Sequence, residues 1–161
     1  MTRSAGEPRV HVLICGERLR GDDGAAPLAA ALLPADIAFL ARIEEVGRLE
    51  VECLLEVAEG RSVVVADAAA GVAPGRVVVL DLEVVAGSTG SGVAPASSHS
   101  LAPHQVLALA EEMRGTPLRG VFVAIGAAGF GFGEGLSQAV AAALPEFAAT
   151  IAAEVRRLAA E

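Results

Sequence analysis

Apolar runs rich in Val, Ile and Leu alternate along the chain with segments whose apolar residues recur at helical spacing. Five runs predict strands, at residues 10–15, 37–46, 62–67, 75–82 and 119–126. The run "SVVVAD" is continuous and β-branched, as expected for a strand covered on both faces of a sheet. We place the end of that strand at Asp67.

Four intervening segments predict helices. Pro27 fits the first turn of a helix that begins between Asp23 and Ala26 and runs to about Leu33, where Pro34 stops it. The other three helices are expected at 49–60, where Gly60 would form the C-cap, at 104–113, and at 136–160, with a kink at Pro145.

Alternating strands and helices predict an α/β fold: a three-layer domain with a mainly parallel, twisted five-stranded sheet flanked by helices on both faces. The length of 161 residues fits one domain. We assign it to residues 10–161, after a flexible tail at 1–9. Residues 84–103 are dense in Gly, Ser, Ala and Pro and predict a long functional loop.

Charge and cysteine content narrow the possible partners. The net charge of -8 opposes binding to nucleic acid or anionic membranes. No apolar run reaches the roughly 18 residues of a membrane span, and the N-terminus lacks the pattern of a secretory signal. We therefore expect a cytoplasmic protein, by default a monomer, whose Cys15 and Cys53 are reduced residues of the core.

Several polar residues are expected at the carboxyl ends of the strands, where ligands bind in such folds. Asp22 and Asp23 follow the first strand, Asp67 ends the third and His104 follows the long loop. Each has an ordinary alternative role as a helix cap or turn residue. Together, carboxylates and an imidazole can supply oxygen and nitrogen ligands to a divalent ion with positions left open for a substrate.

Other candidate sites are weaker. His99 is an alternative metal ligand to His104. Ser97 or Ser98 beside it could suggest a serine nucleophile, but the sequence holds no GxSxG elbow. Cys53 with His104 makes a poor thiol site, because Cys53 falls on the expected core face of its helix. The glycine-rich stretch 126–135 lacks a phosphate-loop pattern.

Four segments carry a family resemblance. The stretch "VLICGERLRGDDGAAPLAAAL" resembles the N-terminal signature of the nickel-iron hydrogenase maturation endopeptidases, a strand that runs into a GN-x-L-x-x-D-[DE]-G loop. The stretches "VVVADAAAGVAPGRVVVL", "SLAPHQVLALAEEM" and "GEGLSQAVAAALP" are similar to later parts of the same family. In order, they cover most of residues 10–150.

The resemblance implies an endopeptidase that removes the C-terminal extension of a hydrogenase large-subunit precursor once nickel has been installed. It places the catalytic, metal-contacting residues at Asp23, Asp67 and His104, with Gly47 in a loop near the site. Two models remain open. The metal is either the nickel held by the precursor, which the resemblance favours, or a divalent ion of the protein itself, and these ligands suit nickel and zinc alike.

The chain also departs from the family pattern. Glu17 stands where the family has Asn, "RLE" follows Gly47 where small residues are usual, and the loop "IGAAGFGFGEG" lacks the usual acid and proline. Two other functions stay open at this point. One is a non-catalytic checkpoint protein that binds the nickel-loaded large subunit, and the other is a generic small-ligand-binding α/β domain.

Overall fold

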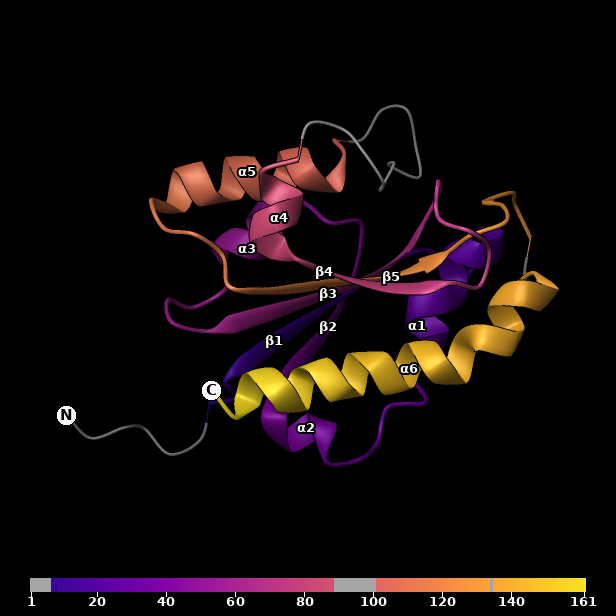
Figure 1. Ribbon diagram of the computed structural model, residues 1–161, viewed down its shortest axis with the longest axis horizontal. Helices are drawn as coiled ribbons and strands as arrows, with labels where there is room; N and C mark the ends of the chain where they lie inside the picture. The colour runs from indigo at the N-terminus through magenta and orange to yellow at the C-terminus, as the bar shows by residue number, and fades with distance from the viewer. Residues whose placement is uncertain (1–6, 89–100, 134) are drawn as a thin grey trace.

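The computed structural model describes residues 7–88, 101–133 and 135–161. It has the predicted three layers, with a five-stranded sheet between two layers of helices (Figure 1). The strand order is β2-β1-β3-β5-β4, and only the β4–β5 pair is antiparallel. The strands are β1 (Val10–Cys15), β2 (Ala41–Gly47), β3 (Ser62–Ala69), β4 (Val77–Asp81) and β5 (Gly120–Gly126).

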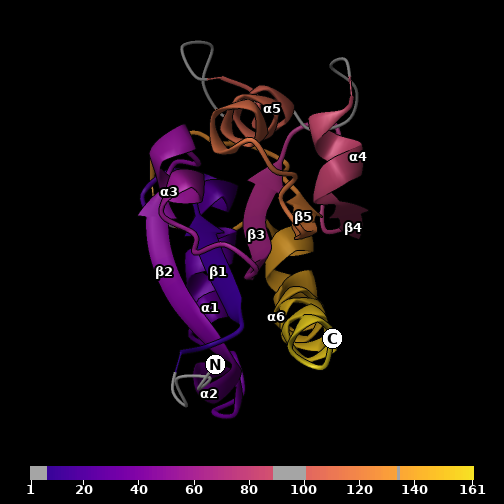
Figure 2. The ribbon, with the colours of Figure 1, turned by 90° about the vertical axis from the view of Figure 1, so that its left-hand side faces the viewer.

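In the described part of the chain, three helices cover each face of the sheet. One layer holds α1 (Ala25–Ala30), α2 (Ile37–Leu40) and α6 (Gln138–Ala159). The other holds α3 (Val51–Leu55), α4 (Leu82–Ala86) and α5 (Pro103–Arg114), with α5 between α3 and α4 (Figure 2). A short 3-10 helix, η1 (Gly21–Gly24), precedes α1. No helix in the described ranges is both long and apolar enough to cross a membrane.

Two apolar cores form because successive side chains of a strand point to opposite faces. Val64 and Ala66 of β3 pack into the core beneath α1 and α6, and Val63 and Val65 into the core beneath α3, α4 and α5. Since β3 is buried on both sides, its continuous β-branched sequence is explained. The same alternation places Asp67 on the face covered by α3, α4 and α5.

The second predicted strand, 37–46, was wrong in its first half. Residues Ile37–Leu40 form helix α2, and the strand spans Ala41–Gly47. Ile37 is fully buried in the core beneath α6, whereas Phe39 is exposed. In a strand, Ile37 and Phe39 would point to the same face, whereas a single helical turn buries Ile37 and leaves Phe39 exposed. The packing of this turn against α6 outweighs the local preference for a strand.

The helix predicted at 49–60 is also shorter than expected, because α3 ends at Leu55. Arg114 of α5 donates from Nη1 to the carbonyls of Leu54 and Val57, at 2.9 and 2.7 Å. These bonds satisfy carbonyls that the end of a helix leaves free. Gly60 lies in a later turn with φ of 80° and does not cap the helix.

Other boundaries agree more closely with the pattern. The predicted helices at 104–113 and 136–160 match α5 and α6, and α6 bends in its N-terminal half, which contains Pro145 (Figure 1). Part of the predicted loop 84–103 belongs to α4, and residues 89–100 lie outside the described part of the chain, as does most of the tail 1–9.

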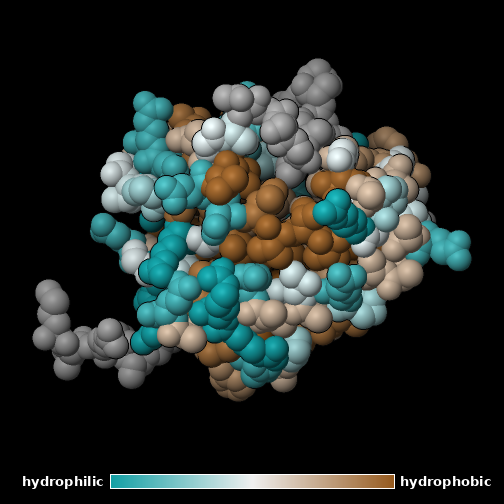
Figure 3. All heavy atoms as spheres, in the orientation of Figure 1, coloured by the Kyte–Doolittle hydropathy of each residue, from teal (hydrophilic) through white to brown (hydrophobic). Residues whose placement is uncertain are grey.

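Strand β4 forms one edge of the sheet and is unexpectedly apolar. Its sequence is "VVVLD", and Val79 is 40% exposed. Apolar side chains gather over β4 on the face seen in Figure 3. Because β4 runs antiparallel to β5, it starts near the carboxyl ends of the parallel strands and leads away from them.

Candidate active site at the carboxyl end of the sheet

The loop after β1 is built on a glycine. Gly16 has φ of 127°, and its N–H donates to the carbonyl of Gly47 at the end of β2, at 2.6 Å. A Cβ at residue 16 would lie 1.9 Å from the carbonyl oxygen of Asp23, so any other residue would displace that carbonyl. Gly16 thus lets the chain turn back and holds Asp23 next to the ends of β1 and β2.

Asp23 does not cap the following helix, the alternative role considered from its sequence position. Its carboxylate instead accepts a hydrogen bond from the N–H of Glu17, at 2.8 Å, and the residue is 5% exposed. Burial raises the pKa of Asp23, and the nearby Glu17 charge adds to this, against the opposing effects of the Glu17 N–H and Arg20. This carboxylate is therefore held in one place by the backbone.

Asp67 lies within β3, since the strand continues to Ala69 and does not end at Asp67 as predicted. Strand β1 pairs with β3 only as far as Ala66, while β5 pairs with it through Ala69. Asp67 is therefore the first residue of β3 beyond its pairing with β1. The side chain of Asp67 accepts the N–H of Ala68 at 2.8 Å.

The pKa of Asp67 is raised to about 8, mainly by burial and further by the negative charge of Asp23, while the Ala68 N–H lowers it. Asp67 therefore binds a proton more readily than an exposed aspartate does. The same two carboxyl groups raise the pKa of the Cys15 thiol, after the larger effect of burial. Asp23, Asp67 and Cys15 thus form one electrostatically coupled group at this edge of the sheet.

Such a pair of carboxyl groups has a specific chemical capacity. Two carboxylates this close repel each other, so the site favours either a shared proton or a bound cation. A divalent ion would relieve the repulsion and replace the proton. The predicted role of Asp23 and Asp67 as oxygen ligands or acid–base groups stays a prediction, and the electrostatic coupling of the two groups is compatible with it.

His104 lies in the first turn of α5, directly after Pro103. The N–H of Ala102 donates to the Gln105 side chain at 2.9 Å, which fixes the start of the helix. His104 is partly buried. Within the described ranges, no three His, Cys, Asp or Glu side chains are arranged to hold a metal ion, so His104 is not already clustered with the two carboxylates.

Asp22 has a different function from its neighbour. It is 1% exposed and accepts hydrogen bonds from the N–H groups of Ala128, Gly129 and Ser137, at 2.8, 3.3 and 2.7 Å, and from the Ser137 hydroxyl at 2.9 Å. Burial alone would raise the pKa of Asp22, but these bonds outweigh burial and lower it. Asp22 therefore ties the glycine-rich stretch 126–135 and the segment before α6 to the first loop.

Sequence reasoning did not find every residue at this site. Cys15 was assigned only to the core, and its closeness to both carboxyl groups follows from the alternation of β1, which a finer count could have shown. Arg20, whose charge acts on Asp23, and Ser137 have no local signal, because loop packing brings them there. His99, Ser97 and Ser98 lie outside the described residues.

Comparison with solved structures identifies the fold. No family model matches the sequence, and no curated protein matches it. The fold is that of the [NiFe] hydrogenase maturation endopeptidases. The structure of the endopeptidase HybD from Escherichia coli matches with a TM-score of 0.72 and 22% identity, covering 92% of this chain and 93% of HybD.

Two further structures show the same likeness. The maturation protease HycI from Thermococcus kodakarensis matches with a TM-score of 0.67 and 22% identity, covering 94% of this chain and 95% of that one. A hydrogenase 3 maturation protease matches with a TM-score of 0.64 and 20% identity over 89% of each chain. These matches extend over nearly the whole chain and confirm the predicted architecture.

Proposed function

We propose that this protein is an endopeptidase that removes the C-terminal extension of a [NiFe] hydrogenase large-subunit precursor after nickel insertion. The observation that carries the proposal is the coupled pair Asp23 and Asp67 at the carboxyl end of the sheet. It lies in a fold shared, over nearly its whole length, with proteins described as hydrogenase maturation endopeptidases.

In this proposal Asp23, Asp67 and His104 contact the nickel that the precursor already holds. The nickel is part of the substrate. The two carboxyl groups fit that role because a cation removes their mutual repulsion, and the imidazole adds a nitrogen ligand from the start of α5. Zinc or another divalent ion could take the same ligands. Cleavage thus depends on prior metal loading.

The peptide bond is broken by hydrolysis, which adds one water molecule across it. We assign the proton transfers to the carboxylates: an ionised carboxylate accepts a proton from the attacking water and then passes that proton to the leaving amine. The fixed hydrogen bond from the Glu17 N–H to Asp23, at 2.8 Å, keeps one member of the pair in position for this transfer.

Turnover distinguishes an enzyme from a checkpoint protein that only binds the precursor. We expect the protein, at a tenth of the precursor concentration, to shorten all of the nickel-loaded precursor encoded in the same genome. Intact-mass spectrometry reports the loss. We expect His104→Ala to reduce the rate at least about a hundredfold, and the control Glu112→Ala, at an exposed position of the same helix, to leave it unchanged.

Two outcomes would contradict the proposal. Stable one-to-one binding with no change in precursor mass would indicate the checkpoint. Stabilisation by nucleotides, measured as a rise in melting temperature without any effect on the precursor, would indicate the small-ligand-binding domain.

A further inference from the structure

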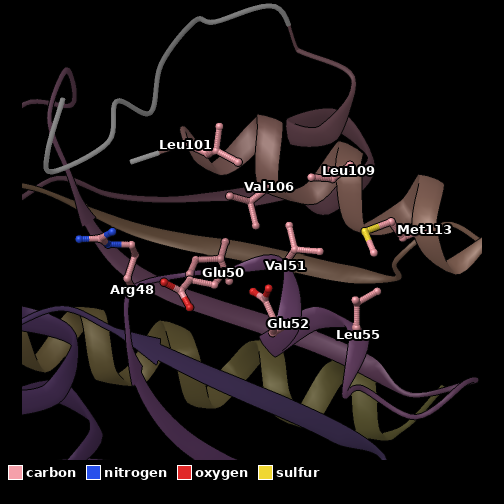
Figure 4. Close-up of a pocket in the computed structure, with 10 residues that line it drawn as sticks. Arg48, Glu50, Val51, Glu52, Leu55, Leu101, Val106, Leu109 and Met113 are labelled. Carbon is pink, nitrogen blue, oxygen red and sulfur yellow. The ribbon is translucent and has the colours of Figure 1, made fainter. Parts of the chain in front are cut away.

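An apolar groove runs between α3 and α5 on the helical layer that faces Asp67. Its cavity volume is about 420 Å³. We call it the α3–α5 groove and define it by six of its seven apolar lining residues, which are Val51, Leu55, Leu101, Val106, Leu109 and Met113. Figure 4 shows these side chains facing the space between the two helices.

The lining is unusual because large apolar side chains are left open to solvent. Leu101 is 53%, Leu109 41% and Met113 61% exposed. Val106, Leu109 and Met113 are spaced three and four residues apart, which makes them one stripe along α5. Val51 and Leu55 form the matching stripe of α3. Exposed apolar side chains gathered beside two such stripes are typical of a binding surface.

One end of the groove is formed by residues close in sequence to the proposed active site. Arg48 lines one end and directly follows Gly47, whose carbonyl accepts the Gly16 N–H of the site loop. Leu101 lies at that same end in Figure 4, three residues before His104. Leu55 and Met113 lie at the opposite end. The groove therefore leads away from the site along α5.

The distances along α5 from His104 to the groove indicate which residue of a bound peptide would reach the groove. Leu109 and Met113 follow His104 by five and nine residues, which is about 7.5 and 13.5 Å along a helix. An extended peptide advances about 3.3 Å per residue. In a peptide bound at the site, the residue two to four positions from the scissile bond would therefore place its side chain in the groove.

The charged side chains at the rim of the groove indicate which residues a bound peptide would carry next to its apolar side chain. Glu50 and Glu52 line the groove together with Arg48, so acidic groups outnumber basic ones there, and none of the three forms an ion pair within the described ranges. The protein as a whole carries a net charge of -8. An occupant with a basic residue beside its apolar residue would complement these carboxylates.

We propose that the α3–α5 groove binds the C-terminal extension of the precursor, through an apolar residue two to four positions beyond the scissile bond and a basic residue next to it. This rests on the proposed function and names how the substrate is recognised. The volume suits one or two side chains of an extended segment and is too small for a folded surface. The groove thereby positions the extension for release.

A double substitution tests the groove without disturbing the core. Because Leu109 and Met113 are exposed, L109Q/M113Q should fold normally. We expect it to raise KM for the nickel-loaded precursor roughly tenfold and to leave kcat within about twofold. Leu28→Gln, a change at a leucine of α1 that is 38% exposed on the opposite layer, is the control and should change neither constant.

Measuring the binding of a peptide tests the groove independently of the proposed peptidase activity. A fluorescent synthetic peptide with the sequence of the extension should bind the wild type and bind L109Q/M113Q at least about tenfold more weakly. That result supports the groove even if the wild type fails to cut the precursor, which would refute only the peptidase.

Three results would overturn the groove assignment. The first is equal peptide affinity, or an absence of binding, for wild type and variant. The second is binding of the already shortened large subunit that is weakened by the variant, which would place the subunit body in the groove. The third is a wild-type dimer in sedimentation that L109Q/M113Q dissociates, which would place a second copy there.

Discussion

Asp67→Asn is expected to abolish precursor processing while making the protein more stable. Asparagine keeps the shape of the side chain and the acceptor for the Ala68 N–H, but it removes the ionisable group from the pair with Asp23. We expect the rate of processing to fall by at least about a hundredfold. Mass spectrometry of the nickel-loaded precursor against time measures it.

The stability of this variant should depend on pH in a defined direction. The pKa of Asp67 is raised to about 8 in the folded protein, against about 3.9 in an unfolded chain. The folded state therefore holds a proton that the unfolded state releases, and Asp67 lowers wild-type stability as pH rises from about 4 to about 8. The advantage of Asp67→Asn should grow over the same interval.

Thermal unfolding in the presence of a chelator measures this effect. The control is Asp81→Asn, which changes an exposed aspartate at the end of β4 and should alter neither processing nor the pH dependence of melting. A variant that still processes the precursor at the wild-type rate would exclude Asp67 from the catalytic site. A difference in melting temperature that does not grow with pH would contradict the buried pair.

Asp22→Ala should cause the largest loss of stability. The substitution leaves three backbone N–H groups and the Ser137 hydroxyl without their acceptor. Each unpaired buried donor costs about 1–3 kcal/mol, and some of these donors will gain water. We expect the free energy of unfolding to fall by about 3–5 kcal/mol and the melting temperature by roughly 10 °C.

The wild type should also lose this contribution in acid. Because hydrogen bonds lower the pKa of Asp22, the carboxylate stabilises the fold fully above its unfolded pKa of about 3.9 and loses the effect as pH falls below that value. Ser137→Ala is the graded control, since it removes one of the four bonds. Equal melting temperatures for Asp22→Ala and wild type would show that the glycine-rich stretch is held by other contacts.

Much of the fold could be predicted because the pattern is strong where burial is complete. The strands β1, β3 and β5 are buried on both faces, so their continuous apolar runs identify them. The errors fall where long-range contacts decide the local structure. Ile37–Leu40 is helical because it packs against α6, and α3 ends early where Arg114 of a distant helix binds its carbonyls.

At the candidate site too, some features could be predicted from the sequence, and others depend on long-range contacts. The topology of a parallel sheet is enough to bring Asp23 and Asp67 to one edge, where the charge of Asp23 raises the pKa of Asp67. The partners of Asp22 could not be predicted, because they lie more than 100 residues away in a loop without regular structure. Glu17, unexplained as a family departure, contributes through its backbone N–H, which any residue other than proline supplies.

Dependence on nickel in the substrate is the most direct test of the proposed function. The same large-subunit precursor, prepared with and without nickel, is incubated with a catalytic amount of the protein and followed by intact-mass spectrometry. We expect the nickel-loaded precursor to lose its C-terminal extension and the nickel-free precursor to keep its full mass. Shortening of both at the same rate, or of neither, would contradict a metal-directed endopeptidase.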